Sequence, residues 1–404
     1  MFTSELPVAP VRASFLPFSL PLIGEEEIAE VIDSLRSGWI TTGPKVKRFE
    51  EEFAQYIGCR HAIAVNSCTA ALHIALTALD IGSGDEVIVP TLTFCSSANV
   101  VVHAGARPVL VDVGEDFNVQ AETIERAITP RTKAIIVVHY SGQACDLAAV
   151  YDIARRHHLA VIEDAAHAVG TEYNGHKSGA SYHTQVLGTN KHITCFSFYA
   201  IKNLTTGEGG MIVTSNPELA ERIRMLSLHG MNRDAWKRYS SAGSWFYEIQ
   251  EAGFKYNMTD IQAGMGIHQL KKLDGFIETR ARYAGMYSEA FSEVPELEAP
   301  LVLGDRKHAW HLYVIKLALE RLKIDRAEFI EELRAQNIGT SVHFIPVHLH
   351  PYYREKFGYR HGDLKQAEYL YERIVSLPLY PGMKEDDVHD VIRAVRNILS
   401  SNRR

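Results

Sequence analysis

Apolar positions follow two different spacings along the first two thirds of the chain. In Glu25–Ser37, apolar side chains recur every three or four residues, which predicts an amphipathic helix. Short apolar runs bounded by turn residues predict strands at His61–Val65, Glu86–Val89, Pro108–Val111, Ala134–Val138, Ala160–Ile162, Cys195–Tyr199 and Gly210–Thr214. Helical patterns lie between and after them, at Thr69–Leu79, Ser96–His103, Ala121–Ile128, Leu147–His157, Pro217–Ser227 and Asp260–Lys272.

This alternation predicts an α/β fold. Strands that are apolar throughout and separated by helices are typical of a mostly parallel sheet covered on both faces. Ligands of such sheets bind beyond the carboxyl ends of the strands. We therefore expect the chemistry in the loops that follow the strands.

The pattern changes near Glu278. A long helix is followed by strand-like Leu312–Leu317, a helix at Arg326–Gln336, strand-like Thr340–Phe344 and a last helix near Asp386–Leu399. We interpret this stretch as a smaller α+β domain. The expected organisation is an N-terminal extension over residues 1–19, a large domain over residues 20–277 and a small C-terminal domain over residues 278–404.

Length, charge and cysteine content narrow the classes of protein. A chain of 404 residues fits one large domain plus a smaller one. The formal net charge of −7 gives no general attraction to nucleic acid or to an anionic membrane, and no apolar run approaches the roughly 20 residues of a membrane span. The five cysteines form no CxxC pair, and the N-terminus lacks the order of a signal peptide. We expect a cytoplasmic protein with reduced thiols.

The loop after the first strand is a candidate phosphate site. Asn66, Ser67, Cys68 and Thr69 lead directly into a helix. Small hydroxyl side chains at a helix N-terminus suit a phosphate, because the backbone N–H groups are free and the dipole end is positive. The same residues are also ordinary helix caps, and the pattern alone leaves both interpretations open.

Two further strand ends carry candidate side chains. Phe94 follows the strand Glu86–Val89, where an aromatic ring either packs in the core or covers a ligand. Asp164 follows Ala160–Ile162, and a partly buried carboxylate needs a cationic or hydrogen-bonded partner. A protonated pyridine nitrogen would be such a partner, and its charge would make the ring an electron sink. The alternative is an aspartate that caps the next helix.

The most informative segment is Phe196–Gly210. In it, Lys202 ends an apolar strand and precedes a turn rich in hydroxyl side chains and glycines. A half-buried lysine is unfavourable unless a partner holds it or its pKa falls. A Schiff base with an aldehyde cofactor removes that cost and lets the lysine exchange with an incoming amine. A surface lysine at a strand end is the alternative.

Together these stretches resemble the DegT/DnrJ/EryC1/StrS family, the sugar aminotransferases of the aspartate-aminotransferase class (PLP fold type I). The resemblance covers nearly the whole chain and rests on Gly38–Pro44, Glu163–His167, Phe196–Gly210, Tyr256–Gln262, Ala309–Tyr313 and Ile338–Phe344. It implies an α/β, aspartate-aminotransferase-like large domain with a mostly parallel sheet and a smaller α+β C-terminal domain. The implied cofactor is pyridoxal 5′-phosphate (PLP).

The resemblance also implies roles for single residues. Lys202 is the Schiff-base lysine and catalytic base, and Asp164 pairs with the pyridinium nitrogen. The other implied cofactor contacts are Cys68, Thr69 and Ser197 at the phosphate, His167 near the ring hydroxyl, Phe94 on the pyridine ring, and Asn257 at the phosphate of the neighbouring subunit's cofactor. The active sites would then be shared across a homodimer, and a monomer would be inactive.

The candidate substrate contacts are Thr41, Tyr313, His343 and His348, with the small-domain core as the alternative place for Tyr313. His343, His348 and His350 also suggest a metal site. No carboxylate or cysteine completes an obvious ligand set around them, so we expect no metal.

One segment departs from the family pattern. Ser181–Thr194 is longer than expected before the next strand and looks like an inserted, solvated loop. Its His183, Lys191 and His192 are of the type that could serve a phosphate. We expect the loop to alter substrate access or to contact the partner subunit.

The resemblance implies a two-stage reaction. Glutamate leaves its amino group on the cofactor, and a nucleotide-linked keto-sugar then takes it up, for cell-surface or secondary-metabolite glycans. A UDP-linked 4-keto sugar is the expected acceptor, since Gly38–Pro44, His139–Gly142 and Gly339–His348 most resemble members acting on such sugars. A 3-keto nucleotide sugar or a keto-inositol is the alternative.

Two other classes of function are more remote. A dehydratase of the same fold would carry histidine in place of Lys202. A non-catalytic relative would have no need of a proton-transfer lysine opposite Asp164. A dinucleotide-binding enzyme is disfavoured because no GxGxxG follows the first strand.

Overall fold

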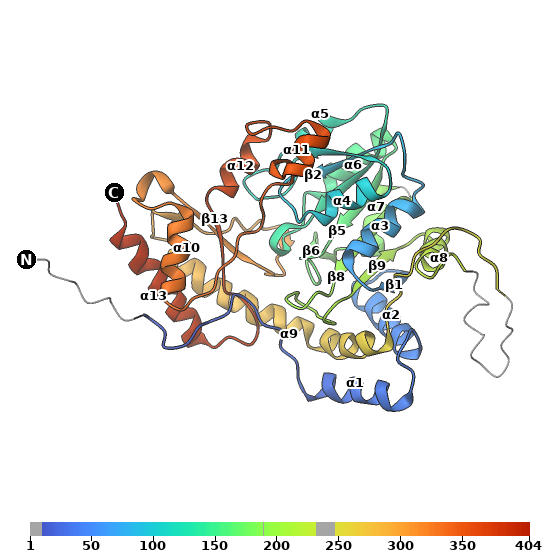
Figure 1. The fold of residues 1–404 in the computed structure, drawn as a ribbon, viewed down its shortest axis with the longest axis horizontal. Helices are drawn as coiled ribbons and strands as arrows, with labels where there is room; N and C mark the ends of the chain where they lie inside the picture. Colours follow the sequence, from blue (N-terminus) through green and yellow to red (C-terminus); the bar gives the residue numbers. More distant parts are fainter. Residues whose placement is uncertain (1–9, 189, 232–246) are drawn as a thin grey trace, which may run out of the picture.

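The computed structural model describes residues 10–188, 190–231 and 247–404. The chain forms a larger part and a smaller part, and the long helix α9 (Asp260–Phe291) runs between them (Figure 1). Residues 1–9 of the expected extension lie outside the described residues. Within the part of the chain that is described, no helix is both long and apolar enough to pass through a lipid bilayer.

A seven-stranded sheet forms the centre of the larger part. Its order is β1-β9-β8-β5-β4-β2-β3. Its strands are β1 (His61–Val65), β2 (Glu86–Pro90), β3 (Arg107–Val111), β4 (Thr132–Val138), β5 (Ala160–Asp164), β8 (His192–Ser197) and β9 (Gly210–Thr214). Only β9 runs against its neighbours, whereas β8, β5, β4, β2 and β3 pair in parallel. The expected mostly parallel α/β sheet is therefore confirmed.

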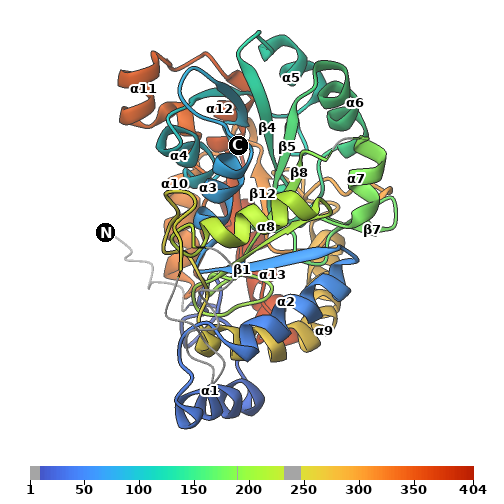
Figure 2. The same cartoon turned by 90° about the vertical axis from the view of Figure 1, so that its right-hand side faces the viewer.

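Helices cover both faces of this sheet (Figure 2). Apolar residues of α3, α4 and α8 share one core cluster with the strands, while those of α2, α9, α5, α6 and α7 pack on the opposite face. These helices are α2 (Pro44–Ile57), α3 (Cys68–Ala78), α4 (Ser96–His103), α5 (Ala121–Ala127), α6 (Leu147–His157), α7 (Ser181–Leu187) and α8 (Pro217–Leu226). Alternate residues of each strand face the two layers, as the apolar runs predicted.

Helix α1 (Glu25–Ser37) lies on α9 in an unexpected orientation. Its polar Glu27 and Ser34 are buried, with Glu27 accepting hydrogen bonds from Gln269 and Lys272 of α9. The predicted apolar face points outward instead, so that Leu35 is 55% exposed. This helix exists as predicted, but its apolar stripe has no cover within the described chain.

The smaller part contains a three-stranded sheet of order β10-β12-β13. Its elements are β10 (Leu297–Glu298), β12 (Tyr313–Leu317), β13 (Ile374–Leu377), α10 (Arg326–Ala335) and α13 (Glu385–Ser401). The expected strand at Thr340–Phe344 is wrong, since Ser341 makes only an isolated bridge to Ser376. The remaining elements are β6 (Glu172–Tyr173), β7 (His176–Lys177), β11 (Arg306–Lys307), α11 (Pro351–Phe357) and α12 (Lys365–Tyr371).

The two parts are joined by a continuous helix and by a contact of the N-terminal segment. The boundary placed between residues 277 and 278 falls inside α9, which is one continuous helix. At the N-terminus, the backbone of Leu16 bonds to Asn337 and Gly339 of the smaller part. The residue ranges 20–277 and 278–404 remain our proposal for two domains, with α9 shared between them.

Candidate functional site

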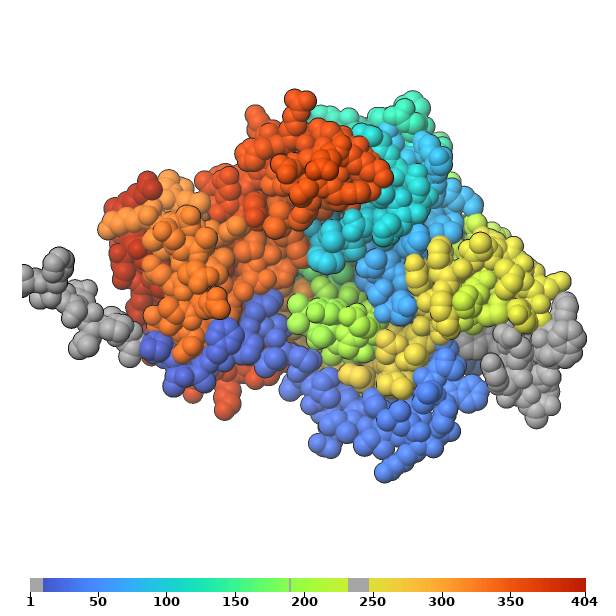
Figure 3. Space-filling view, viewed as in Figure 1, coloured from blue at the N-terminus to red at the C-terminus, as the bar shows by residue number. Residues whose placement is uncertain are grey.

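Three candidate residues lie at the carboxyl ends of parallel strands or in the turns that follow them. Phe94 follows β2, Asp164 is the last residue of β5, and Lys202 lies in the turn after β8. In the space-filling view, the green turn near residue 200 is exposed between the orange surface of the smaller part and the blue and cyan surface of the larger part (Figure 3). The position of the site agrees with the expectation for an open α/β sheet.

Asp164 is a buried carboxylate held by neutral donors. The Ser97 hydroxyl donates to its Oδ2 at 2.7 Å and the Ala166 N–H to its Oδ1 at 3.1 Å. Burial raises the pKa of Asp164, while these hydrogen bonds and the positive charge of Lys202 act in the opposite direction. Among the described residues no cation lies within ion-pair distance of this carboxylate, so it has capacity for a cationic ligand atom.

Lys202 lies close to Asp164 but makes no ion pair with it. The strand β8 ends at Ser197, so Lys202 sits in the following turn rather than at the strand end as predicted. Its Nζ lies 3.4 Å from Nε2 of His311. Burial lowers the pKa of Lys202 to about 8, although Asp164 and Cys68 oppose the shift. A larger fraction of its amine is therefore unprotonated at neutral pH than in an ordinary lysine.

The loop before α3 has the geometry of a phosphate seat. Ser67 caps the helix, and its Oγ accepts the N–H of Ala70 at 3.1 Å. The N–H groups of the first helical residues, Cys68 and Thr69, point out of the helix and have no place in its own hydrogen-bond ladder. Gly210 begins β9 against this loop, where a Cβ would lie 2.6 Å from the Ser67 carbonyl carbon. The cap and the phosphate interpretations are compatible.

Two histidines near Lys202 are kept neutral. Burial and the charge of Lys202 hold the pKa of His167 well below its usual range and lower that of His343 to about 3. His167 accepts the backbone N–H of Ser141 at Nδ1, and its ring lies 6.5 Å from that of His343. Neutral imidazoles can accept or donate a hydrogen bond without adding charge to the site.

Phe94 and Ser197 lie at the same edge of the sheet. The Phe94 ring is 57% exposed and touches the ring of Phe344 with centroids 5.9 Å apart. An exposed aromatic face at a strand end suits stacking on a planar ligand better than core packing. Ser197 is the last residue of β8, and its hydroxyl is buried near the turn that carries Lys202.

Two predicted substrate contacts are wrong. Tyr313 is fully buried in β12, where its hydroxyl lies 3.0 Å from that of Ser288. His348 is also fully buried, between the Thr91 hydroxyl at 2.8 Å and the Glu368 carboxylate at 2.9 Å. Because neither side chain reaches a surface, both have structural roles.

The solvated loop expected at Ser181–Thr194 is also wrong for two of its histidines. This segment is not a solvated loop, since it forms α7 and the start of β8. His183 and His192 are buried, and His192 Nε2 lies 2.5 Å from the carboxylate of Glu163. Residue 189 of the segment is outside the described residues.

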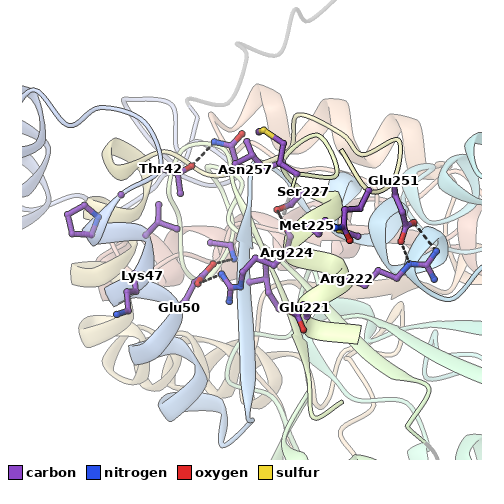
Figure 4. Close-up of a pocket in the computed structure, with 18 of the residues that line it drawn as sticks. Thr42, Lys47, Glu50, Glu221, Arg222, Arg224, Met225, Ser227, Glu251 and Asn257 are labelled. Carbon is purple, nitrogen blue, oxygen red and sulfur yellow. Dashed lines mark hydrogen bonds and ion pairs between the residues drawn. The ribbon is translucent and has the colours of Figure 1, made fainter. Parts of the chain in front are cut away.

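Asn257 lines a cavity of the larger part, together with Thr42, the neighbour of the predicted substrate contact Thr41. A pocket of about 930 Å³ lies between α2, β1 and α8, and its described lining residues include neither Lys202 nor Asp164. In it, Asn257 Nδ2 donates to Thr42 Oγ1 at 2.6 Å (Figure 4). The preceding residue, Thr41, is exposed in the segment between α1 and α2. The backbone of Asn257 pairs with Val65, the last residue of β1, just before the phosphate loop of the same chain.

Two residues near the candidate site were not predicted from the sequence. Ser97 contacts Asp164 from the first turn of α4, and His311 contacts Lys202 from the segment before β12. A hydroxyl one turn after Phe94 was a signal for Ser97. No local pattern marks His311, which stands between Trp310 and Tyr313. Within the described parts of the chain, no group of three or more His, Cys, Asp or Glu side chains could hold a metal ion.

The geometry fits PLP. Asp164 can face a protonated ring nitrogen, Lys202 can reach an aldehyde, the α3 N-terminus can hold a phosphate, and Phe94 can cover a flat ring. These features converge from four loops at one edge of the sheet.

Comparisons with known proteins agree with this geometry. Residues 21–396 match the sequence profile of the DegT/DnrJ/EryC1/StrS aminotransferase family. The chain is 57% identical to the uncharacterized protein MJ1066 of Methanocaldococcus jannaschii over 97% of this chain and 100% of that one. It is 53% identical to the spore coat polysaccharide biosynthesis protein SpsC of Bacillus subtilis over 96% of this chain and 98% of that one.

A solved structure shares the fold. The pyridoxamine-phosphate (PMP) form of the putative sugar aminotransferase Spr1654 of Streptococcus pneumoniae superposes with a TM-score of 0.88 at 33% identity, over 96% of this chain and 99% of that one. Its PLP form gives a TM-score of 0.87. The chain therefore belongs to the DegT/DnrJ/EryC1/StrS aminotransferase family and is a PLP-dependent sugar aminotransferase of PLP fold type I.

Proposed function

We propose that this enzyme transfers the amino group of glutamate to a nucleotide-linked keto-sugar through Lys202. The observation that carries the proposal is the half-buried amine of Lys202 near the buried carboxylate of Asp164. The lysine has a pKa lowered to about 8, and the carboxylate has no cationic partner among the described residues. When bound, PLP supplies an electron sink for the carbon that loses its proton.

The chain's own residues divide the remaining work. Lys202 anchors the cofactor and, once its amine is released, moves the proton between the donor's α-carbon and the cofactor's exocyclic carbon. Asp164 keeps the ring nitrogen protonated, and Phe94 covers the ring. Neutral His167 would contact the ring hydroxyl of the bound cofactor.

The proposed ligands of the cofactor phosphate are backbone N–H groups and a small side chain. The first N–H groups of α3, at Cys68 and Thr69, and the hydroxyl of Ser197 serve it on one side. Asn257 binds the phosphate of the cofactor in the second subunit. The exposed apolar side chains of α1 and of Trp39 and Ile40 support a homodimer, since a second copy of the chain would cover them.

The acceptor class rests on likeness to relatives. Gly38–Pro44, His139–Gly142 and Gly339–His348 resemble UDP-4-amino-4-deoxy-L-arabinose aminotransferase, which favours a UDP-linked 4-keto sugar. The name of SpsC favours a product for a cell-surface polysaccharide. Thr41 and His343 are the proposed substrate contacts, because His343 lies beside His167 and Thr41 is exposed. We propose a cytoplasmic enzyme.

Borohydride reduction tests the role of Lys202. We expect the reduced protein to carry the phosphopyridoxyl group on the peptide that contains Lys202. We expect Lys202→Ala to keep cofactor affinity but to lose transamination. Label on another lysine, or a Lys202→Ala enzyme with normal turnover, contradicts the proposal.

The acceptor is identified with a panel of substrates. Nucleotide-linked 4-keto and 3-keto sugars and a keto-inositol are each incubated with glutamate, and 2-oxoglutarate is measured. The proposal predicts the largest kcat/KM for a UDP-linked 4-keto sugar. Turnover restricted to 3-keto sugars or to keto-inositol would replace it with the corresponding alternative.

A further inference from the structure

A line of hydrogen bonds connects the backbone at residue 309 with Lys202. Asn203 Nδ2 donates to the Ala309 carbonyl at 2.7 Å. The amide oxygen of Asn203 lies 3.3 Å from His311 Nδ1, and His311 Nε2 lies 3.4 Å from Lys202 Nζ. Asn203 and His311 are each 4% exposed, so water does not compete for the contact between them.

The hydrogen bond from Asn203 to the Ala309 carbonyl determines which atoms donate and accept in the other two contacts. Since the Ala309 carbonyl can only accept, the NH₂ group of Asn203 faces it and the amide oxygen faces His311. An amide oxygen can only accept, so Nδ1 of His311 carries the ring proton. In the neutral ring, Nε2 then presents a lone pair toward Lys202.

The surroundings keep His311 in that neutral form. Burial, the charge of Lys202, and the neighbouring His167 and Arg280 together hold the pKa of His311 well below its usual range. Arg280 is itself buried and donates to the carbonyls of Trp310 and His311. This guanidinium fixes the backbone of His311 and disfavours a second positive charge beside it.

Lys202 has few other partners. The titratable groups near it are Asp164 on β5, Cys68 on α3, His167, His343 and His311. Within the described chain, His311 is the hydrogen-bond partner found for Lys202 Nζ, and no carboxylate lies within ion-pair distance of it. A buried ammonium group without an acceptor is unfavourable.

We propose that His311, oriented by Asn203, is a positioning residue that accepts a hydrogen bond from the Lys202 amine whenever that amine is not bonded to the cofactor. This inference rests on the proposed function, in which Lys202 is released in every cycle. The contact keeps the free amine near the reacting carbon instead of letting it swing into solvent. The N–H of Lys202 donates to Nε2 of His311, and no covalent bond changes.

The test measures the proton equilibrium of Lys202 in the full-length, cofactor-free chain. An amine-acylating reagent is applied from pH 6 to pH 10, and acylation of the Lys202 peptide is followed by mass spectrometry. His311→Leu removes the acceptor and thus favours the uncharged amine. We expect the pKa of Lys202 to fall, so that its reactive fraction at pH 7 rises about three- to tenfold. His311→Gln, which keeps an acceptor oxygen, should restore most of the wild-type value.

Two further variants control for general disruption. His308→Gln changes a buried histidine of the same segment, which contacts Ser141 and the Trp310 N–H but not Lys202. It should leave Lys202 unchanged. Asn203→Ala frees the ring tautomer and should shift Lys202 in the same direction as His311→Leu, by a smaller amount.

The outcomes separate this inference from the proposed function. An unchanged or raised pKa of Lys202 in His311→Leu and Asn203→Ala overturns the inference, as does an equal shift in His308→Gln. If His311→Leu does not fold, Asn203→Ala alone decides. None of these results depends on turnover, whereas failure of the proposed function would appear as borohydride label on another lysine.

Discussion

Asp164 shows how a buried carboxylate can be prepared for a cationic ligand. Its two oxygens accept hydrogen bonds from Ser97 and Ala166, which orient the group without neutralising it. Asp164→Asn keeps the shape but removes the charge. We expect kcat to fall by about 10²- to 10³-fold and the cofactor to be lost more readily during gel filtration. Ser97→Ala is the matched control and should reduce kcat less, because the charge remains. A wild-type rate in Asp164→Asn would exclude the proposed role.

Lys202 gives the cofactor-free chain a characteristic pH dependence. Burial lowers the pKa of Lys202 from 10.5 to about 8. Between these values the unfolded chain binds more protons than the folded chain, so folding stability rises with pH in this window. Below pH 8 the buried charge costs about 1–2 kcal/mol, since the side chain is partly exposed.

Lys202→Met removes this charge and therefore tests the shift. The variant should be more stable than the wild-type chain at pH 7 by about 1–2 kcal/mol, and the difference should shrink toward pH 10. Urea unfolding of both chains without cofactor at pH 7 and pH 10 measures it. A difference that is independent of pH would mean that the pKa of Lys202 is not lowered.

At the residue scale, the positions predicted best from the sequence were those of side chains at strand ends. Asp164 and Phe94 follow apolar runs directly, so their place at the edge of the sheet could be inferred from a local pattern. His311 could not, because it meets Lys202 only through the fold, 109 residues further along the chain. Tyr313 was misjudged for a related reason, since burial of a strand residue depends on its neighbours in space.

At the element scale, the segment Ser181–Thr194 shows that polar side chains alone do not predict exposure to solvent. Its histidines were interpreted as solvated, yet they are buried against a carboxylate. Glu163 accepts hydrogen bonds from Tyr151 at 2.6 Å, His139 at 2.9 Å and His192 at 2.5 Å. Burial would raise the pKa of Glu163, but the two imidazoles hold it well below its usual range. The segment is thus a helix and a strand joined to β5 by this network.

Glu163→Gln tests the contribution of the network to stability. The amide cannot accept all three hydrogen bonds, so we expect a loss of about 2–4 kcal/mol at pH 7 in urea unfolding. Because the folded-state pKa is depressed, the contribution of Glu163 is complete above the ordinary carboxyl range and declines as pH falls toward the folded pKa. The two chains should therefore converge in acid.

A less buried carboxylate serves as the control for Glu163. Glu172 on β6 contacts Lys307 at 3.4 Å near the surface. Glu172→Gln should change stability by less than about 0.5 kcal/mol. If both variants lose the same amount, the buried network contributes nothing beyond a surface contact.

Helices α1 and α2 were not predicted equally well from the sequence pattern. Helix α2 is absent from the elements expected from the sequence, although Pro44 at its first turn and Phe49 and Phe53 on one face are ordinary helix signals. The apolar stripe of α1 was recognised but does not pack on its own chain. The helical periodicity of apolar residues predicts that the apolar face of a helix will be covered. It does not predict whether the same chain or another one covers it.

At the scale of the whole molecule, the contacts of Asn257 bear on which chain completes each site. The Asn257 side chain bonds to Thr42 in the pocket between α2 and α8, yet its backbone pairs with Val65 just before the phosphate loop of its own chain. Sharing of sites across a dimer therefore needs a test in which the two chains differ. Lys202→Ala removes the anchor, and Asn257→Asp places a carboxylate against a phosphate.

Mixed dimers of these two variants distinguish the arrangements. If Asn257 serves the neighbouring subunit, the mixed dimer contains one site with both Lys202 and Asn257 intact, and the other site carries both defects. Unfolding and refolding an equal mixture should then restore about one quarter of wild-type activity, since half of the dimers are mixed and each has one of two sites. If each chain completes its own site, every site carries one defect and activity stays at the level of the separate variants. Analytical ultracentrifugation of the same mixture checks that dimers have formed.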